Sequence, residues 1–478
     1  MRVLYSYFPW QRCGDSLTGW AAPCHPDDGR IAETGEHRDL AGGYHQSCDL
    51  RKWISLEVIG LLGLTRFGQM QSPRWDNGCI AEELRWGSDY YQKLVREDGG
   101  MLDSVFIPLG WGPRDFYLSD SPPPAMWSTI RHQALLAAYF QPRDAAYSET
   151  CKQVALRVWQ YMTSTKPRYE KYQAPALPPL GHDHLNSWYA GFYPGSALDL
   201  AHRLCAAVAL YRVTGEPGLL EDAVQSASAL VDLQVGSAGE NNDVGACFWE
   251  DPARKNLVES GGYFWHSTGP LGLCELLELK PEHPDSAKWR KAVERVAQQY
   301  LNTSRRNPWG LIATRWSIQD QPVPAPGAGQ SVSDLYNGGK LDLPGAAGPD
   351  RFAVYQYRSY GYNVPISAAG VFMRYAAKLT GRNEYRCVAQ RQMDWILGCN
   401  PYDASAVEGV GYNQPLRGFY GEFFPPTPQI PGAVSTGLTS GSILMQNSGF
   451  ANEYDMPVVG WVLWLMTEQA GSSVPQGK

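Results

Sequence analysis

Residues 197–233 read ALDLAHRLCAAVALYRVTGEPGLLEDAVQSASALVDL, and this stretch decides the fold class. Apolar side chains recur at spacings of three and four residues over Ala197–Thr214 and again over Leu219–Leu233, which predicts two helices. Gly215 stands between them, where a helix commonly ends, and Gly381 has the same place in a second stretch of the same pattern. The stretch therefore predicts a helical hairpin.

The same periodicity recurs along most of the chain, whereas alternating strand patterns are scarce. The further predicted helices are Ala125–Phe140, Ala145–Thr163, Gly269–Leu279, Pro284–Leu301, Val364–Leu379, Asn383–Leu397 and Met456–Thr467. No Gly/Ser linker interrupts them, so we expect a single catalytic domain over 1–478. A chain of paired helices of this length closes most naturally as an all-α toroid, an (α/α)6 barrel, with long loops forming a cleft at one face.

Composition excludes some classes of function. The chain has 478 residues, 41 Lys and Arg against 48 Asp and Glu, and a net charge of −7, which argues against nucleic acid as a partner. No phosphate-binding glycine motif and no serine-hydrolase elbow is present. Aromatic residues make up 12% of the chain, with 49 Gly and 35 Pro. Aromatic rings on structured loops suit a carbohydrate cleft, although a large aromatic core would give the same composition.

The N-terminal residues carry no apolar run followed by a small-residue cleavage site, and no stretch is long and apolar enough to span a membrane. The simplest expectation is a cytoplasmic enzyme with no membrane partner. A secreted or periplasmic protein trimmed of its export signal would look the same. Ten Cys are too few for a disulfide scaffold in a chain of this length. The sequence does not determine the oligomeric state.

Two polar clusters lie at opposite ends of the chain. Residues 33–53 read ETGEHRDLAGGYHQSCDLRKW, and the segment ANEYDMP opens the final predicted helix. A ring-shaped fold makes its first and last helices neighbours, so Asp49 and Glu453 are expected to meet. Glycoside cleavage needs one protonated carboxyl and one ionised carboxylate, in an inverting enzyme about 6.5–9.5 Å apart. Asp455 is a rival acid, and Asp49 could instead cap a helix over Leu50–Leu62.

Several motifs resemble glycoside hydrolase family 9, the inverting (α/α)6-barrel cellulases and their relatives. The family's GGWHDAGD stands here as GGYHQSCD over Gly42–Asp49, and its LKWGTDY stands as LRWGSDY over Leu84–Tyr90. Its DYILGDNP stands as DWILGCNP over Asp394–Pro401, and a catalytic NE motif matches Asn452–Glu453. The resemblance implies inverting hydrolysis of a β-linked glucoside or oligosaccharide, with Glu453 as general acid and Asp49 as general base.

One departure concerns the chemistry directly. The family holds its attacking water with two aspartates, and here Gln46 replaces the first. An amide oxygen still orients water but adds no negative charge. Weakened hydrolysis, a different substrate or different chemistry would follow. The alternatives are a lyase, a transglycosylase or a biosynthetic tailoring enzyme on the same barrel, and a catalytically silent carbohydrate binder.

A set of polar and aromatic side chains in the loops is expected to contact the sugar. The GHDH segment precedes a predicted barrel-mouth loop, and Arg417 stands where the family's PHHR substrate segment is missing. Aromatic rings at such places stack on pyranose faces, or else they fill the barrel. The predicted substrate contacts are Gln46, His45, Trp53, His184, Trp188, Trp265, His266, Tyr360, Arg417 and Asp455.

Near the N-terminus, Cys13, Cys24 and His25, with His45 or His37, have the residue types of a metal site. The resemblance implies a structural zinc here, because some relatives of the family bind one with an early Cys…Cys-His set. Leu50 stands where those relatives place their last histidine. The alternative is a group of reduced thiols and hydrogen-bonded histidines. The predicted chemistry itself requires no cofactor.

Overall fold

The structure is a computed structural model of the chain. It describes residues 1–20, 23–31, 33–47, 52–70, 78–105, 116–118, 120–164, 192–235, 245–258, 265, 269–313, 315–317, 351–353, 363–413, 430–439, 449–450 and 454–471. Within these ranges the protein is dominated by α-helices, and its few strands are two or three residues long.

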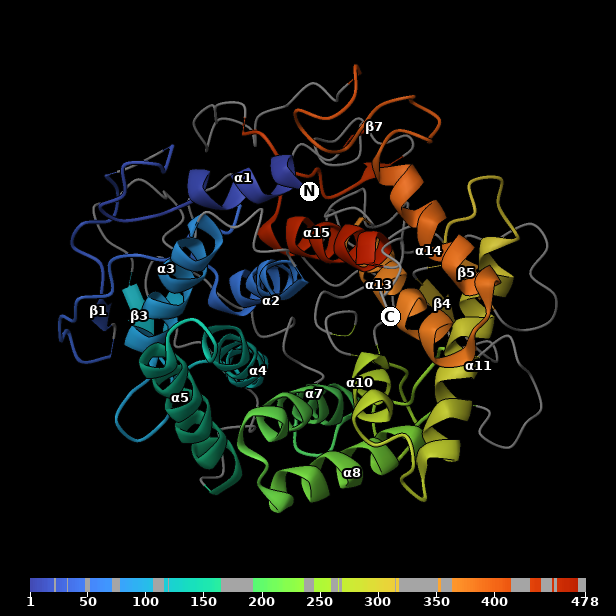
Figure 1. The fold of residues 1–478 in the computed structure, drawn as a ribbon, viewed down its shortest axis with the longest axis horizontal. Helices are drawn as coiled ribbons and strands as arrows, with labels where there is room; N and C mark the ends of the chain where they lie inside the picture. Colours follow the sequence, from blue (N-terminus) through green and yellow to red (C-terminus); the bar gives the residue numbers. More distant parts are fainter. Residues whose placement is uncertain are drawn as a thin grey trace.

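The helices form two concentric rings (Figure 1). Within each ring, the helices follow one another around the molecule in chain order. The inner ring consists of α2 (Ile54–Met70), α4 (Pro123–Phe140), α7 (Ala197–Thr214), α10 (Leu271–Leu279), α13 (Asn363–Thr380) and α15 (Met456–Gly471). The outer ring consists of α1 (Arg2–Trp10), α3 (Cys79–Leu94), α5 (Ala145–Ser164), α8 (Pro217–Asp232), α11 (Ser286–Ser304) and α14 (Asn383–Ile396). This arrangement confirms the predicted (α/α)6 barrel.

Local chemistry explains how the hairpins form. The Ser196 hydroxyl caps α7 by accepting a hydrogen bond from the backbone N–H of Asp199 at 3.2 Å. Gly215 ends the helix with a φ of 72°, a left-handed conformation that glycine adopts at little cost. Pro217 then begins α8, where the fixed φ of proline suits the first helical position.

The first and last inner helices close the ring through backbone contact. A Cβ atom built on Gly63 of α2 would lie 2.0 Å from the carbonyl oxygen of Gly460 in α15. A Cβ on Gly460 would in turn lie 2.5 Å from the carbonyl oxygen of Gly60. Because no side chain larger than hydrogen fits at these positions, the glycines set how closely the two ends of the chain approach.

A buried ionic cluster connects several inner helices. Glu275 of α10 accepts hydrogen bonds from Arg66 of α2 at 2.6 Å and from Arg131 of α4 at 2.8 Å. Both guanidinium groups lie over the ring of Trp464 in α15. Burial by itself raises the pKa of Glu275, but the charges of Arg131 and Arg66 hold it at about 2. Glu275 is therefore an anion at neutral pH.

Short strands lie in the loops outside the rings. β1 (Arg30–Ile31) pairs in parallel with β3 (Phe116–Leu118), which pairs in antiparallel fashion with β2 (Asp103–Val105). Two antiparallel pairs follow: β4 (Arg315–Ser317) with β5 (Arg351–Ala353), and β6 (Leu438–Thr439) with β7 (Gly449–Phe450).

The structure confirms all nine helices predicted from periodicity, with ends shifted by a few residues. The pattern missed α1, which is short and contains Pro9, and α3. The limits predicted for a helix over Leu50–Leu62 were wrong. Lys52 and Trp53 precede α2, and the helix continues to Met70. Among the described residues, no helix is long and apolar enough to cross a membrane.

Candidate functional site

The segments that precede α2 and α15 are joined by their backbones. Ser47 and Asp455 form an antiparallel bridge, and the N–H of Met456 donates to the carbonyl oxygen of Gln46 at 2.9 Å. The hydroxyl of Tyr7 donates to the same carbonyl at 3.3 Å. As predicted, the two ends of the chain meet where the first and last inner helices begin.

A third inner helix begins at the same place. Ser435 pairs with Tyr454, and the N–H of Asn363, the first residue of α13, donates to the carbonyl oxygen of Thr436 at 2.9 Å. The side-chain Oδ1 of Asn363 and Oγ1 of Thr436 are buried and have no hydrogen-bond partner among the described residues. Nothing in the sequence pattern distinguished these two polar groups at the end of the barrel.

The side chains of Gln46 and Asp455 contact each other. The Nε2 of Gln46 donates a hydrogen bond to Oδ1 of Asp455, and the two residues are only 3% and 1% exposed. They come from opposite ends of the chain. The predicted acid and base, Glu453 and Asp49, lie outside the described residues, but each stands close in sequence to this contact.

The structure also describes part of the predicted sugar-binding set. Trp265 is 2% exposed, and its ring packs on Phe248 with centroids 5.0 Å apart. Trp53 is half-buried just before α2, and the N–H of Glu57 donates to its carbonyl oxygen at 2.8 Å. The imidazole of His45 is fully buried beside Cys24. The remaining predicted contacts, His184, Trp188, His266, Tyr360 and Arg417, lie outside the described residues.

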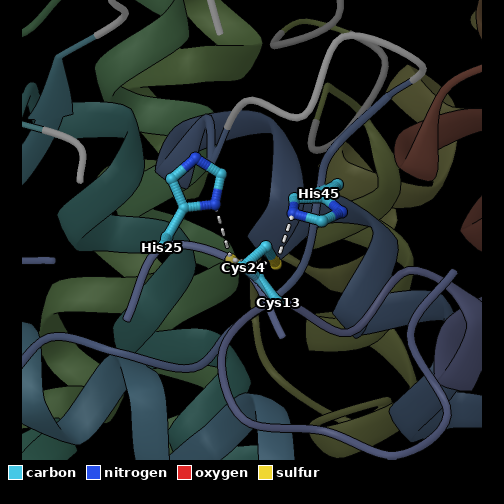
Figure 2. A group of neighbouring side chains, drawn as sticks. All are labelled: Cys13, Cys24, His25 and His45. Carbon is cyan, nitrogen blue, oxygen red and sulfur yellow. Dashed lines mark hydrogen bonds between the residues drawn. The ribbon is translucent and has the colours of Figure 1, made fainter. Parts of the chain in front are cut away.

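Cys13, Cys24, His25 and His45 form one compact cluster (Figure 2). Their four ligand atoms all lie within 4.8 Å of one another. Cys13 Sγ is 3.2 Å from His25 Nδ1, and Cys24 Sγ is 3.5 Å from Cys13 Sγ and 3.4 Å from His45 Nε2. Of the two histidines left open by the sequence, His45 completes the set.

These positions fit a metal ion. Zinc bonds of about 2.3 Å to sulfur and about 2.0–2.1 Å to nitrogen place the ligands of a tetrahedral site about 3.3–3.8 Å apart. The separations between these side chains are close to that range. Hydrogen bonding with Cys13, His25 and His45 also lowers the pKa of the Cys24 thiol, and metal binding requires the thiolate. The other histidine, His37, is exposed and lies 3.0 Å from Asp27.

A buried ion pair connects the cysteine–histidine segment with the start of α2. The ammonium of Lys52 contacts the carboxylate of Asp28, and neither side chain is exposed. Lys52 also donates to the carbonyl oxygen of Leu40 at 3.4 Å, and its Nζ lies 5.0 Å from the ring centroid of Tyr90. The sequence gave no signal for this pair, because a lysine and an aspartate 24 residues apart form no local motif.

Glu57, in the first turn of α2, is a second feature that the sequence did not indicate. It is fully buried, and neither carboxylate oxygen has a hydrogen-bond partner among the described residues. Burial raises the pKa of Glu57 to about 8, against the opposite effect of the Lys52 charge. Glu57 is thus mainly protonated at neutral pH, and the buried charges of Lys52 and Asp28 balance each other.

Comparison with known proteins identifies the class as the glycosidases with an (α/α)6 barrel. Residues 2–419 match glycosyl hydrolase family 9, and the chain belongs to this family. A cellodextrinase of Butyrivibrio fibrisolvens is 21% identical in an alignment 477 residues long. The alignment covers 92% of this chain and 74% of the relative.

Solved structures of endoglucanases have a similar fold. A metagenome-derived family 9 endoglucanase superposes with a TM-score of 0.64 at 18% identity, over 98% of this chain and 80% of that chain. An endoglucanase of the termite Nasutitermes takasagoensis gives a TM-score of 0.64 at 16% identity, over 99% of both chains. At these identities the likeness shows the fold.

Proposed function

We propose that this protein hydrolyses β-linked glucosides or gluco-oligosaccharides with inversion, using Glu453 as general acid and Asp49 as general base. Membership of glycosyl hydrolase family 9 supports this reaction class. The names of its relatives support the substrate class, since they include a cellodextrinase and plant endoglucanases. The chemistry uses no cofactor.

The observation that carries the proposal is the backbone contact of Gln46 and Ser47 with Asp455 and Met456. Asp49 follows Ser47 by two residues, and Glu453 precedes Asp455 by two. Chain length alone therefore limits how far the two carboxylates can lie from the bridge. An inverting pair needs about 6.5–9.5 Å between its carboxyl groups, which leaves room for one water.

In the proposed reaction, Glu453 donates its proton to the glycosidic oxygen as the bond to the anomeric carbon breaks. A water molecule attacks that carbon from the opposite face, and Asp49 accepts the proton that the water loses. Tyr454, the next residue in the chain, is buried with its ring edge-on to that of Tyr7, and the two ring centroids are 5.9 Å apart. Such surroundings favour a protonated carboxyl.

We propose that Trp53, His184, Trp188, His266, Tyr360 and Arg417 contact the sugar. Trp265 fits this role less well, because its ring is buried against Phe248. His45 also fits a sugar contact less well. Its burial beside the cysteines supports a role as a metal ligand instead.

We also propose that Cys13, Cys24, His25 and His45 bind a structural zinc ion. Two thiols and two imidazoles leave no coordination position for a substrate or an activated water, which is typical of structural rather than catalytic zinc. The ion would thus contribute to folding and would fix the segment that ends at His45.

The test of the proposed function is product analysis with aryl β-glucosides and a panel of β-glucan oligosaccharides. New reducing ends, with the α-anomer as the first product in an NMR time course, are expected. A β-anomer as first product would contradict inversion. Unsaturated or transferred products would indicate a lyase or transglycosylase, and binding without turnover would indicate a carbohydrate binder.

A further inference from the structure

The contact between Gln46 and Asp455 lies where this chain departs from its family motif. Gln46 occupies the position of the first water-holding aspartate, and its Nε2 donates to Oδ1 of Asp455. The backbone holds the two residues in place, since Ser47 bridges Asp455 and the Met456 N–H binds the Gln46 carbonyl. The backbone pairing therefore keeps the two side chains within reach of each other.

The hydrogen bond to Asp455 defines which way the Gln46 amide faces. An ionised carboxylate only accepts hydrogen bonds, whereas a primary amide has a donating NH2 group and an accepting oxygen. The NH2 group of Gln46 faces Asp455, because Nε2 is the atom that donates to Oδ1. Because the amide is planar, its Oε1 points away from Asp455. Rotation of the amide by half a turn would bring two acceptors together in a buried place, which is costly.

We propose that Asp455 is ionised and is a positioning residue that fixes the Gln46 amide so that Oε1 accepts a hydrogen bond from the attacking water. This role rests on the proposed hydrolysis. The two functions of the missing aspartate are then divided between two residues. Gln46 provides the oxygen that orients the water, and Asp455 provides the negative charge one hydrogen bond further away.

The division is compatible with the proposed step. The water oxygen forms a bond to the anomeric carbon while the glycosidic bond breaks, and the leaving oxygen takes the proton of Glu453. One hydrogen of the water passes to Asp49 as a proton. The other stays on the new hydroxyl group of the sugar and is held by Oε1 of Gln46. No further oxidant, reductant or co-reactant is required.

The first test is Asp455→Asn. This change keeps the side-chain shape, but asparagine both donates and accepts, so the Gln46 amide is no longer fixed in one orientation. We expect kcat to fall about 10- to 100-fold, the range for loss of a hydrogen bond to a charged group, with KM changed by less than about threefold. Asp232→Asn, on an exposed carboxylate of α8, is the matched control and should leave kcat unchanged.

The decisive variant is the exchange of the two groups. Gln46→Asp alone places two buried carboxylates in contact and should also lower kcat. The double variant Gln46→Asp/Asp455→Asn restores one carboxylate and one amide with their positions exchanged. We expect its kcat to exceed that of both single variants. A double variant no faster than the faster of the two single variants would overturn the proposed role.

Thermal unfolding separates positioning from stability. If the contact served only the fold, Asp455→Asn would lower Tm but leave kcat per folded molecule unchanged, and this result would refute the inference. The failure of the proposed function gives a different pattern. Wild-type protein without hydrolysis on any β-glucoside refutes both proposals, whereas hydrolysis that is insensitive to Asp455→Asn refutes only the positioning role.

Discussion

Lys52 and Asp28 form an ion pair from which solvent is fully excluded. Asp28 stands three residues after His25 of the cysteine–histidine cluster, and Lys52 stands three residues after Asp49. The pair therefore ties the segment that would bind metal to the start of α2, three residues after the proposed base. His45 gives a second link, because Gln46 follows it directly in the chain.

Removal of one partner of this pair should destabilise the protein. Lys52→Met leaves Asp28 buried without its cation, and a cost of about 3–5 kcal/mol is expected. Asp28→Asn should cost less, because Glu57 can lose its proton and balance the charge of Lys52. The double variant Asp28→Asn/Lys52→Met should be closer to wild type than Lys52→Met alone. Urea unfolding at fixed zinc concentration measures all three.

The exposed pair between Lys288 and Asp232 is the matched control, with its atoms 2.9 Å apart. Lys288→Met should change the free energy of unfolding by no more than about 1 kcal/mol, because surface ion pairs contribute little. A Lys52→Met variant as stable as Lys288→Met would show that the buried pair does not hold the two segments together.

The zinc proposal predicts metal content and a stability effect. Purified protein should contain about one zinc ion per chain, and chelation should lower its Tm, because a closed four-ligand site stabilises the folded state. Cys13→Ser should lose both the metal and the stabilisation. Cys387→Ser should lose neither, since Cys387 is exposed on α14. Protein that is free of zinc and unaffected by chelation would contradict the proposal.

The raised pKa of Glu57 predicts how the free energy of unfolding depends on pH. An unfolded glutamate titrates near pH 4.3, whereas burial raises the pKa of folded Glu57 to about 8. Between these values the unfolded chain binds fewer protons than the folded protein, so stability falls as pH rises. The contribution of Glu57 to the free energy of unfolding is fully present below about pH 4.3 and is lost by about pH 8. The change is about 4–5 kcal/mol.

Glu57→Gln should remove this part of the pH dependence. The measurement is the free energy of unfolding of wild type and variant at several pH values between 5 and 8.5. Lys52, Tyr44, Tyr90 and Tyr91 interact electrostatically with the carboxyl group and are the same in both proteins. Parallel curves for the two proteins would mean that Glu57 is not protonated in the folded state. The exposed Glu82→Gln on α3 is the control.

The sequence predicted the ring of helices because long amphipathic segments such as Ala197–Thr214 carry their own periodicity and end signals. It missed α1, whose nine residues include a proline. It could not predict how closely α2 approaches α15, since the contact between Gly63 and Gly460 joins residues about 400 positions apart. Pattern in the sequence is local, whereas ring closure depends on non-local packing.

The same limit applies to the site. The motif identified Gln46 as a departure, and Asp455 was recognised as a carboxylate near the last helix, but no pattern indicated that the two side chains form a hydrogen bond. His45 was named both as a sugar contact and as a possible ligand, and only the fold shows that its ring faces Cys24. The partners of Asp28 and Glu57 likewise come from other segments of the chain.

The proposed acid and base predict losses of rate without losses of binding. Glu453→Gln keeps the shape of the side chain but cannot donate the acid proton, and Asp49→Asn cannot accept a proton from water. Each should lower kcat by about 10²–10⁴-fold, the usual contribution of a general acid or base, while oligosaccharide affinity is retained. Glu294→Gln, on the exposed side of α11, should behave as wild type. A near-wild-type rate for Glu453→Gln would move the acid to Asp455, because that carboxylate is the other one at the start of α15. An active Asp49→Asn would place the catalytic centre elsewhere in the barrel, since Gln46 carries no charge that could replace the base.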